Sequence, residues 1–334
     1  MTTTLPATDT SPPGARTTAR LSEKSRVLLV TGGVLLVVAV VAGLRAGSGA
    51  VLTQALVTGV LTGGIYSLVA MGLTLIYGVL HIINFANGSL VALALYLTLV
   101  CVQDLGMHPY VALVVVMPAM FLLGALLQAT LLNPVMKAPI QIQLLITIGL
   151  ALAIENGLLL AFGPNPRSVA LPGNTGVRVL GATVELSRIW AFVGALVIVA
   201  LLALLLQRTR VGTEIRAVAA NPEGARLVGI DIRWIYVLTF GLGAMAAGAA
   251  GVLVSPFTTI EPTTGAVFNL TAFVVVVLGG MGNVPGALVG GLVVGLTEQL
   301  AGLILPSQSP LLAVFVVFLV VLFVRPRGVF GRSA

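Results

Sequence analysis

Charged residues are scarce in this chain, because Asp, Glu, Lys and Arg together make up only 8% of its 334 residues. A soluble globular protein carries about three times that fraction. Hydrophobic residues reach 58%, and the mean hydropathy is +1.13. One buried core cannot absorb so much apolar sequence, so most of it must face lipid or pack between membrane helices. The composition predicts an all-α membrane protein.

Cysteine, histidine and lysine are also rare. A single cysteine, Cys101, excludes an internal disulfide or thiolate cluster, and two histidines are too few for a multi-histidine metal site. Neither lysine, Lys24 or Lys137, follows a glycine, so the G-x-x-x-x-G-K-[ST] phosphate loop is missing, as is the HExxH motif. We therefore expect no catalytic residue, metal or cofactor, and any ATP that drives the protein must be bound by a partner subunit.

The net charge of +7 could indicate a nucleic-acid partner. The basic residues, however, stand at the ends of apolar runs, where Lys and Arg orient membrane helices. Membrane lipid is therefore the expected partner, and nucleic acid is not.

The apolar runs predict a helical bundle of about ten membrane spans. Residues 1–26 read as a disordered tail, and 27–44 as a retained extra transmembrane helix rather than a cleaved signal peptide. The main transmembrane domain is expected over 45–325, followed by a short tail, 326–334. The predicted spans are 27–44, 54–80, 88–103, 110–132, 143–162, 189–206, 234–254, 266–278, 285–305 and 310–324.

The basic residues test this count. If the N-terminus lies inside and the spans alternate, 13 of the 17 basic residues fall on the inside and four, Arg45, Arg167, Arg178 and Arg188, on the outside. This asymmetry obeys the positive-inside rule and predicts that both termini are cytoplasmic. Glycines at a spacing of four, such as Gly59 with Gly63 and Gly286 with Gly290, predict close helix packing.

The inside loop 207–233 is the most polar stretch after the N-terminal tail. It predicts two short helices, the first over 213–220 and the second capped by Asn221. Pro222 suits the first helical position, Glu223 complements the helix dipole, and Gly229 suits the stop. Such a helical hairpin could dock on a soluble partner, or it could be only a solvated connector.

Four polar residues interrupt apolar sequence and are candidates for a translocation path: Asn84, Asn87, Glu155 and Glu298. Intramembrane polar groups are costly and tend to face protein or water. For the asparagines the alternative is helix capping, by Asn87 or Ser89. For the two glutamates the alternative is a local partner or a position near the membrane interface.

Four sequence blocks in order resemble the permease subunits of bacterial branched-chain amino-acid ABC importers, specifically the H-type of the two paired permeases. The resemblance covers about residues 52–332 and rests on GGIYSLVAMGLTLIYGVLHIINFANGSLVALALYL (63–97), LLITIGLALAIENGLLLAFG (144–163), RVGTEIRAVAANPEGARLVGID (210–231) and VVVVLGGMGNVPGALVGGLVVGLTEQL (274–300). The chain departs from the family at Asn87, where His is usual, at Glu155, where Gln is frequent, and in its N-terminal extension.

The resemblance implies the ABC importer permease fold in the bacterial inner membrane, a second permease subunit, two cytoplasmic ATPase subunits that bind ATP, and an extracytoplasmic binding protein. The expected substrates are branched-chain or related amino acids. The alternative is a secondary transporter or channel for a small polar solute. The resemblance also assigns coupling to the ATPase subunits to segment 207–233, with the candidate residues Arg216, Ala217, Asn221, Pro222, Glu223, Arg226 and Gly229.

Overall fold

The computed structural model describes residues 49–169, 171, 175–179, 181–305 and 309–324. The predicted tails, 1–26 and 326–334, and the predicted extra helix 27–44 lie outside the described residues, so they remain predictions.

Every apolar run predicted after residue 45 forms a helix. In the described part of the chain, six helical stretches are long and apolar enough to cross a membrane, and α3, α10 and α12 are shorter. About ten crossings for the whole chain therefore stays a prediction. The apolar helices are α2 (Gly49–Leu80), α3 (Asn87–Gln103), α4 (Leu113–Leu127), α5 (Ile140–Phe162), α6 (Leu186–Arg208), α9 (Ile232–Val254), α10 (Thr264–Gly279), α11 (Val284–Ala301) and α12 (Pro310–Val324). A π turn, Gln128–Leu132, and a 3-10 turn, Asn133–Val135, continue α4, and a second 3-10 turn, Ser255–Phe257, follows α9.

Helices α2 and α9 form the centre of the bundle. Both are mostly buried, whereas α5 exposes most of its surface and packs mainly on α3. Helix α9 is in contact with α2, α3, α4 and α6, and small residues make these contacts close. A Cβ atom added at Gly251, for example, would lie 2.8 Å from the Ala94 Cβ. The small residues of α9 thus let four helices surround it.

Glycines on α2 and α11 form a seam between these helices. A Cβ atom at Gly63 would lie 2.8 Å from both the Gly291 carbonyl oxygen and the Leu292 Cα. The Ser67 hydroxyl shares its single proton between two acceptors, the Leu288 carbonyl at 2.9 Å across the seam and the Gly63 carbonyl at 2.8 Å along α2. The close packing predicted from the glycine spacing is confirmed here.

A β-hairpin adds to the otherwise helical fold. Strands β1 (Gly176–Val179) and β2 (Ala182–Glu185) pair antiparallel, with Val177 opposite Val184. The Gln54 side chain exchanges two hydrogen bonds with the Thr183 backbone, at 2.7 and 2.8 Å, which fixes the hairpin to the start of α2. The sequence indicated only a break between two spans in this region.

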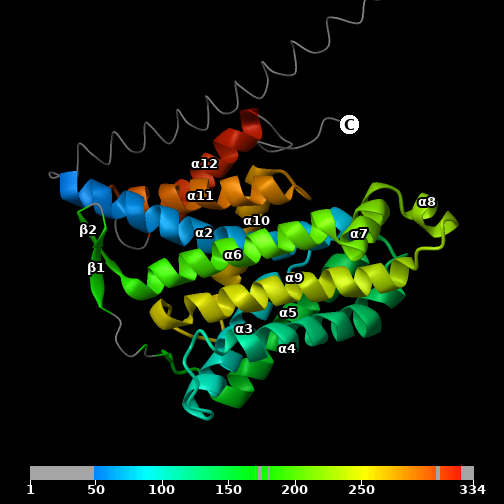
Figure 1. The fold of residues 1–334 in the computed structure, drawn as a ribbon, viewed down its shortest axis with the longest axis horizontal. Helices are drawn as coiled ribbons and strands as arrows, with labels where there is room; N and C mark the ends of the chain where they lie inside the picture. The colour runs from blue at the N-terminus through cyan, green and yellow to red at the C-terminus, as the bar shows by residue number, and fades with distance from the viewer. Residues whose placement is uncertain (1–48, 170, 172–174, 180, 306–308, 325–334) are drawn as a thin grey trace, which may run out of the picture.

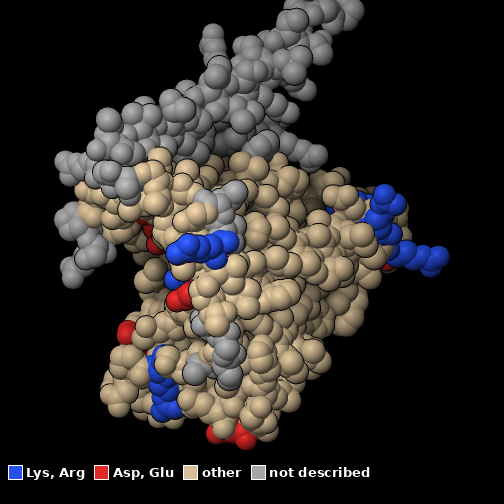
Figure 2. Space-filling model, turned by 60° about the vertical axis from the view of Figure 1, so that its left-hand side comes forward, with Lys and Arg blue, Asp and Glu red and all other residues tan. Residues whose placement is uncertain are grey.

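The long helices run along the molecule, with the hairpin at one end and the short helices α7 and α8 at the other (Figure 1). Most of the surface in Figure 2 is uncharged, and Lys and Arg side chains project from the tip at its right. Lys137, Arg226 and Arg233 line one cavity at the α8 end, whereas Arg178 lies in the hairpin and Arg188 just after it. Among the described residues, the basic side chains that the sequence assigned to opposite sides thus lie at opposite ends of the bundle.

Candidate functional site

The polar segment 207–233 folds as a pair of short helices, α7 (Arg210–Ala220) and α8 (Pro222–Leu227). The Asn221 side-chain oxygen accepts a hydrogen bond from the Gly224 N–H at 3.0 Å, Pro222 takes the first helical position, and Glu223 lies in the first turn. Gly229 follows α8 with a φ of +87°, a backbone conformation that favours glycine. The predicted cap, helix start and stop are all confirmed.

Helix α7 begins three residues earlier than predicted, because Thr209 caps it. The Thr209 hydroxyl oxygen accepts from the Gly212 N–H at 3.0 Å. At Gly212 a Cβ atom would collide with the Leu205 and Leu206 carbonyl oxygens, so glycine lets α7 fold back against the end of α6. A glycine early in a helix reads as a breaker in the sequence, which explains the late predicted start.

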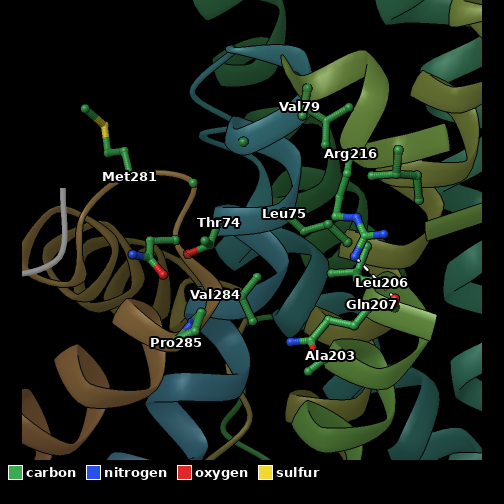
Figure 3. A pocket seen from close by; sticks show the side chains of 15 residues that line it. Thr74, Leu75, Val79, Ala203, Leu206, Gln207, Arg216, Met281, Val284 and Pro285 are labelled. Carbon is green, nitrogen blue, oxygen red and sulfur yellow. Dashed lines mark hydrogen bonds between the residues drawn. The ribbon is translucent and has the colours of Figure 1, made fainter. Parts of the chain in front are cut away.

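The inner face of α7 packs on the hydrophobic core of its own chain. Ile215 and Val218 are fully buried, and Ala217 is half-buried against the same core. The Arg216 guanidinium donates a hydrogen bond to the Gln207 carbonyl at 3.3 Å (Figure 3). It donates a second to the Thr213 hydroxyl, also at 3.3 Å. Arg216 therefore binds the carbonyl at the end of α6 in its own chain, and its role in coupling to the ATPase subunits stays a prediction.

Arg216 also borders a cavity of about 470 Å³ that joins four segments (Figure 3). Its walls come from the end of α2, the end of α6, helix α7, and the turn 281–285 that begins α11. The Gly78 and Gly282 backbones approach closely there, since a Cβ atom at Gly78 would lie 3.2 Å from the Gly282 Cα. Helix α7 itself contacts α2, one of the two helices of the glycine seam.

The tip of α8 presents apolar side chains that the sequence reasoning missed. Leu227 is 89% exposed and Val228 is 77% exposed, although both lie in a polar segment. Glu223 and Arg226 are exposed beside them. The sequence did contain a signal for this surface. The apolar pair Leu-Val stands between Arg226 and Gly229, where helix periodicity does not require apolar residues. We call Leu227 and Val228 the α8 tip.

Asn84 and Asn87 are both buried, at 1% and 0% exposure, as the cost of polar groups within the membrane predicts. The expectation that Asn87 or Ser89 caps α3 is wrong. The N-cap is Ala86, whose N–H donates to the Asn84 side-chain oxygen at 3.0 Å, while the Asn87 amide turns to α2 and donates to the Val69 carbonyl at 3.3 Å. The Asn87 side chain thus joins α3 to α2 and does not cap α3.

A third asparagine, Asn269 of α10, completes this cluster and was missed. Its side-chain oxygen accepts from the Gly88 N–H at 3.3 Å, where Gly88 and Gly265 bring α3 and α10 into backbone contact. The Asn84 Nδ2 and Asn87 Oδ1 atoms are buried and have no hydrogen-bond partner among the described residues. The half-buried Asn269 therefore lies next to the start of α3, the helix that begins at Asn87.

The two candidate glutamates lie apart from each other. Glu155 is half-buried on α5, which packs mainly on α3. Glu298 is on α11, where its carboxyl group interacts with the Tyr66 hydroxyl of α2 while its Oε2 atom is buried without a hydrogen-bond partner. Helix α11 packs on α2, α10 and α12. The structure therefore does not bring the two carboxylates into one site.

Comparison with known proteins agrees with this architecture. The chain is 30% identical over 293 residues to the high-affinity branched-chain amino acid transport system permease protein BraD of Pseudomonas aeruginosa, covering 84% of this chain and 95% of the relative. It is 31% identical over 298 residues to the corresponding protein LivH of Escherichia coli K12, with the same coverage. A ribose import permease, RbsC of Escherichia coli K12, is 34% identical over 98 residues, 27% of this chain and 30% of the relative.

No solved structure matches the chain. Residues 55–325 match the family described as branched-chain amino acid transport system / permease component. This range includes every helix from α3 to α12 and most of α2. The chain is a multi-pass membrane protein that belongs to this permease family.

Proposed function

We propose that this chain pairs with a second permease subunit to form the path by which branched-chain or related amino acids cross the bacterial inner membrane. Two cytoplasmic ATPase subunits drive the cycle, and an extracytoplasmic binding protein delivers the amino acid. The relatives that cover most of the chain carry branched-chain amino acid transport in their names. The observation that carries the proposal is the α7–α8 pair, a capped and projecting element at one end of an apolar bundle.

The ATP is bound by the partner subunits, since no G-x-x-x-x-G-K-[ST] loop occurs in the sequence. Coupling needs a rigid element that passes movement of the ATPases to the membrane helices. Helix α8 offers the exposed α8 tip to the partner, while α7 contacts α2, α6 and α9. The asymmetry of basic residues favours a cytoplasmic position for this end and for both termini.

The translocation path is assigned to three asparagines: Asn84 and Asn87 at the start of α3, and Asn269 on α10. Buried amides with unpartnered atoms are available to water or to a polar solute when the helices separate. The Gly88–Gly265 contact closes this point in the present structure, because the backbones touch without intervening side chains. Glu155 and Glu298 remain candidates for the path, each on a different part of the bundle.

Co-purification tests the proposal. The tagged chain, expressed with its paired permease and ATPase subunits, is expected to retain the ATPases, and ATP hydrolysis in proteoliposomes is expected to rise when loaded binding protein is added. A variant with Leu105→Asp serves as a control, since Leu105 is 61% exposed between α3 and α4, far from α8. Failure of the wild-type chain to retain any ATPase subunit contradicts the proposal.

A further inference from the structure

Three basic residues border a second cavity, of about 860 Å³, at the α8 end of the bundle. Lys137 comes from the turn between α4 and α5, Arg226 from α8, and Arg233 from the first turn of α9. Among the described residues, no ion pair joins any of the three to an acidic side chain. The cavity thus gathers positive charge from three separate elements without an ion pair among the described residues.

One acidic residue, Asp231, also lines the cavity, and its charge is already engaged. Its carboxylate caps α9, accepting hydrogen bonds from the Arg233 N–H at 2.9 Å and the Trp234 N–H at 3.4 Å. A carboxylate at a helix N-terminus is stabilised by the helix dipole, so it compensates the arginines only in part. The cavity remains cationic and suits an anionic group.

The position of the cavity relative to the membrane indicates which kind of anion it can bind. Its residues stand where two membrane spans end, the helical stretch Leu113–Val135 and the stretch Ile232–Phe257. Trp234 is 58% exposed beside it and Tyr236 lines it, and such aromatic side chains gather at the level of lipid headgroups.

Exposed apolar side chains also lead to the cavity along α4. Leu122 and Leu126 are 66% and 58% exposed and stand one turn apart on α4, and Ala129, almost one turn further along, lines the cavity. A free phosphate ion would use only the basic residues, whereas a phospholipid would also cover these leucines with an acyl chain. Basic pockets between membrane helices are known as sites for anionic headgroups.

We propose that this cavity binds the phosphate of an anionic phospholipid headgroup, with Lys137 and Arg233 as its main cationic contacts and an acyl chain along the exposed leucines of α4. The site goes beyond the transport function and places a lipid next to the turn that follows α8. A lipid bound there would hold the α4–α5 turn and the start of α9 together.

Native mass spectrometry of the full chain in detergent tests the site, with phosphatidylglycerol and phosphatidylcholine offered in equal amounts. The wild-type chain is expected to retain phosphatidylglycerol preferentially. The double variant Lys137→Gln with Arg233→Gln is expected to lower that preference by roughly 30-fold, because each basic residue near an anionic surface contributes about 1 kcal/mol. The variant Arg210→Gln, which removes an exposed charge of α7 outside the cavity, is expected to keep it.

The double variant with Lys137→Arg and Arg233→Lys restores the charges and is expected to restore binding, which separates lost binding from misfolding. Equal phosphatidylglycerol retention by the wild-type and glutamine variants overturns the proposal, as does an equal loss in Arg210→Gln. Displacement of the lipid by millimolar inorganic phosphate would assign the site to a soluble anion. Loss of ATPase co-purification with unchanged lipid retention would make the cavity a protein-docking surface instead.

Discussion

Single atoms decide the packing at the seam between α2 and α11. Gly63 and Gly291 bring two backbones together at a distance that leaves no room for a Cβ atom. The Ser67 hydroxyl can reach the Leu288 carbonyl only because of this approach. At the other end of the molecule, one amide oxygen of Asn221 determines where α8 begins. Both features are visible in the sequence because glycine spacing and capping chemistry depend on local residue identity.

Substitution of Gly63 tests the seam. The change Gly63→Val puts side-chain atoms against the α11 backbone, so the helices must separate, at a cost of about 1–3 kcal/mol. We expect a lower midpoint of thermal unfolding in detergent. Gly149→Val is the matched control, since a Cβ atom at Gly149 on α5 meets nothing within 4 Å. Equal midpoints for the two variants would show that the seam does not limit stability.

Removal of the α8 cap gives a local prediction. The change Asn221→Ala leaves the Gly224 N–H without its side-chain acceptor and costs about 1 kcal/mol of helix stability. Amide hydrogen exchange at Gly224 is expected to accelerate about fivefold, and Asn221→Ser is expected to keep most of the protection. Unchanged exchange in the alanine variant would mean that the cap does not hold α8.

The two short helices use their surfaces differently at the element scale. Helix α7 buries Ile215 and Val218 in the core and uses Arg216 to hold the end of α6, whereas α8 exposes Leu227 and Val228. Since Ala217 is half-buried against the core of its own chain, a bulky residue there would disturb α7 directly. Docking is therefore better tested at the α8 tip than at Ala217.

Charge placed on the α8 tip should separate docking from folding. We expect Leu227→Asp with Val228→Asp to reduce ATPase co-purification at least tenfold, because an unpaired carboxylate in an apolar contact is costly to desolvate. The thermal midpoint of the isolated chain should stay unchanged. Arg226→Ala is expected to weaken assembly only slightly, since an exposed ion pair contributes about 1 kcal/mol or less. Full ATPase retention by the double aspartate variant would place the docking surface elsewhere.

The sequence predicts the apolar helices, the α8 cap and the glycine seam because each depends on local composition or periodicity. It could not predict that Arg216 turns back to the Gln207 carbonyl or that Asn269 meets Gly88, since both contacts depend on tertiary packing. The hairpin could not be predicted either, because it too depends on tertiary packing. Its strands have four residues each and are held to α2 by Gln54, 129 residues away from Thr183.

The whole molecule has two chemically different ends. The hairpin end carries Arg178 and Arg188, and the α8 end carries the cavities next to α7 and α8 together with most of the described basic residues. Between them the surface is largely uncharged, as a lipid-facing band requires (Figure 2). This polarity supports the proposal that α7 and α8 lie on the cytoplasmic side.

Cysteine labelling tests that orientation. An impermeant maleimide added to intact cells with a permeabilised outer membrane is expected to label Thr183→Cys, which is exposed on β2, and to spare Arg210→Cys on α7. Ser187 lies near the hairpin but is fully buried, so it is unsuitable as a probe. The native Cys101 is also buried and should give little background. The reverse labelling pattern would invert the proposed topology.

The central claim is that this chain moves its substrate only as the membrane part of an ATP-driven assembly. Uptake of labelled leucine into proteoliposomes tests it most directly. The chain is reconstituted alone or with its paired permease and ATPases, and the binding protein is added on the side of the membrane opposite the ATPases. The account predicts ATP-dependent uptake by the full assembly and none by the chain alone. Uptake by the chain alone under a proton or sodium gradient would contradict it.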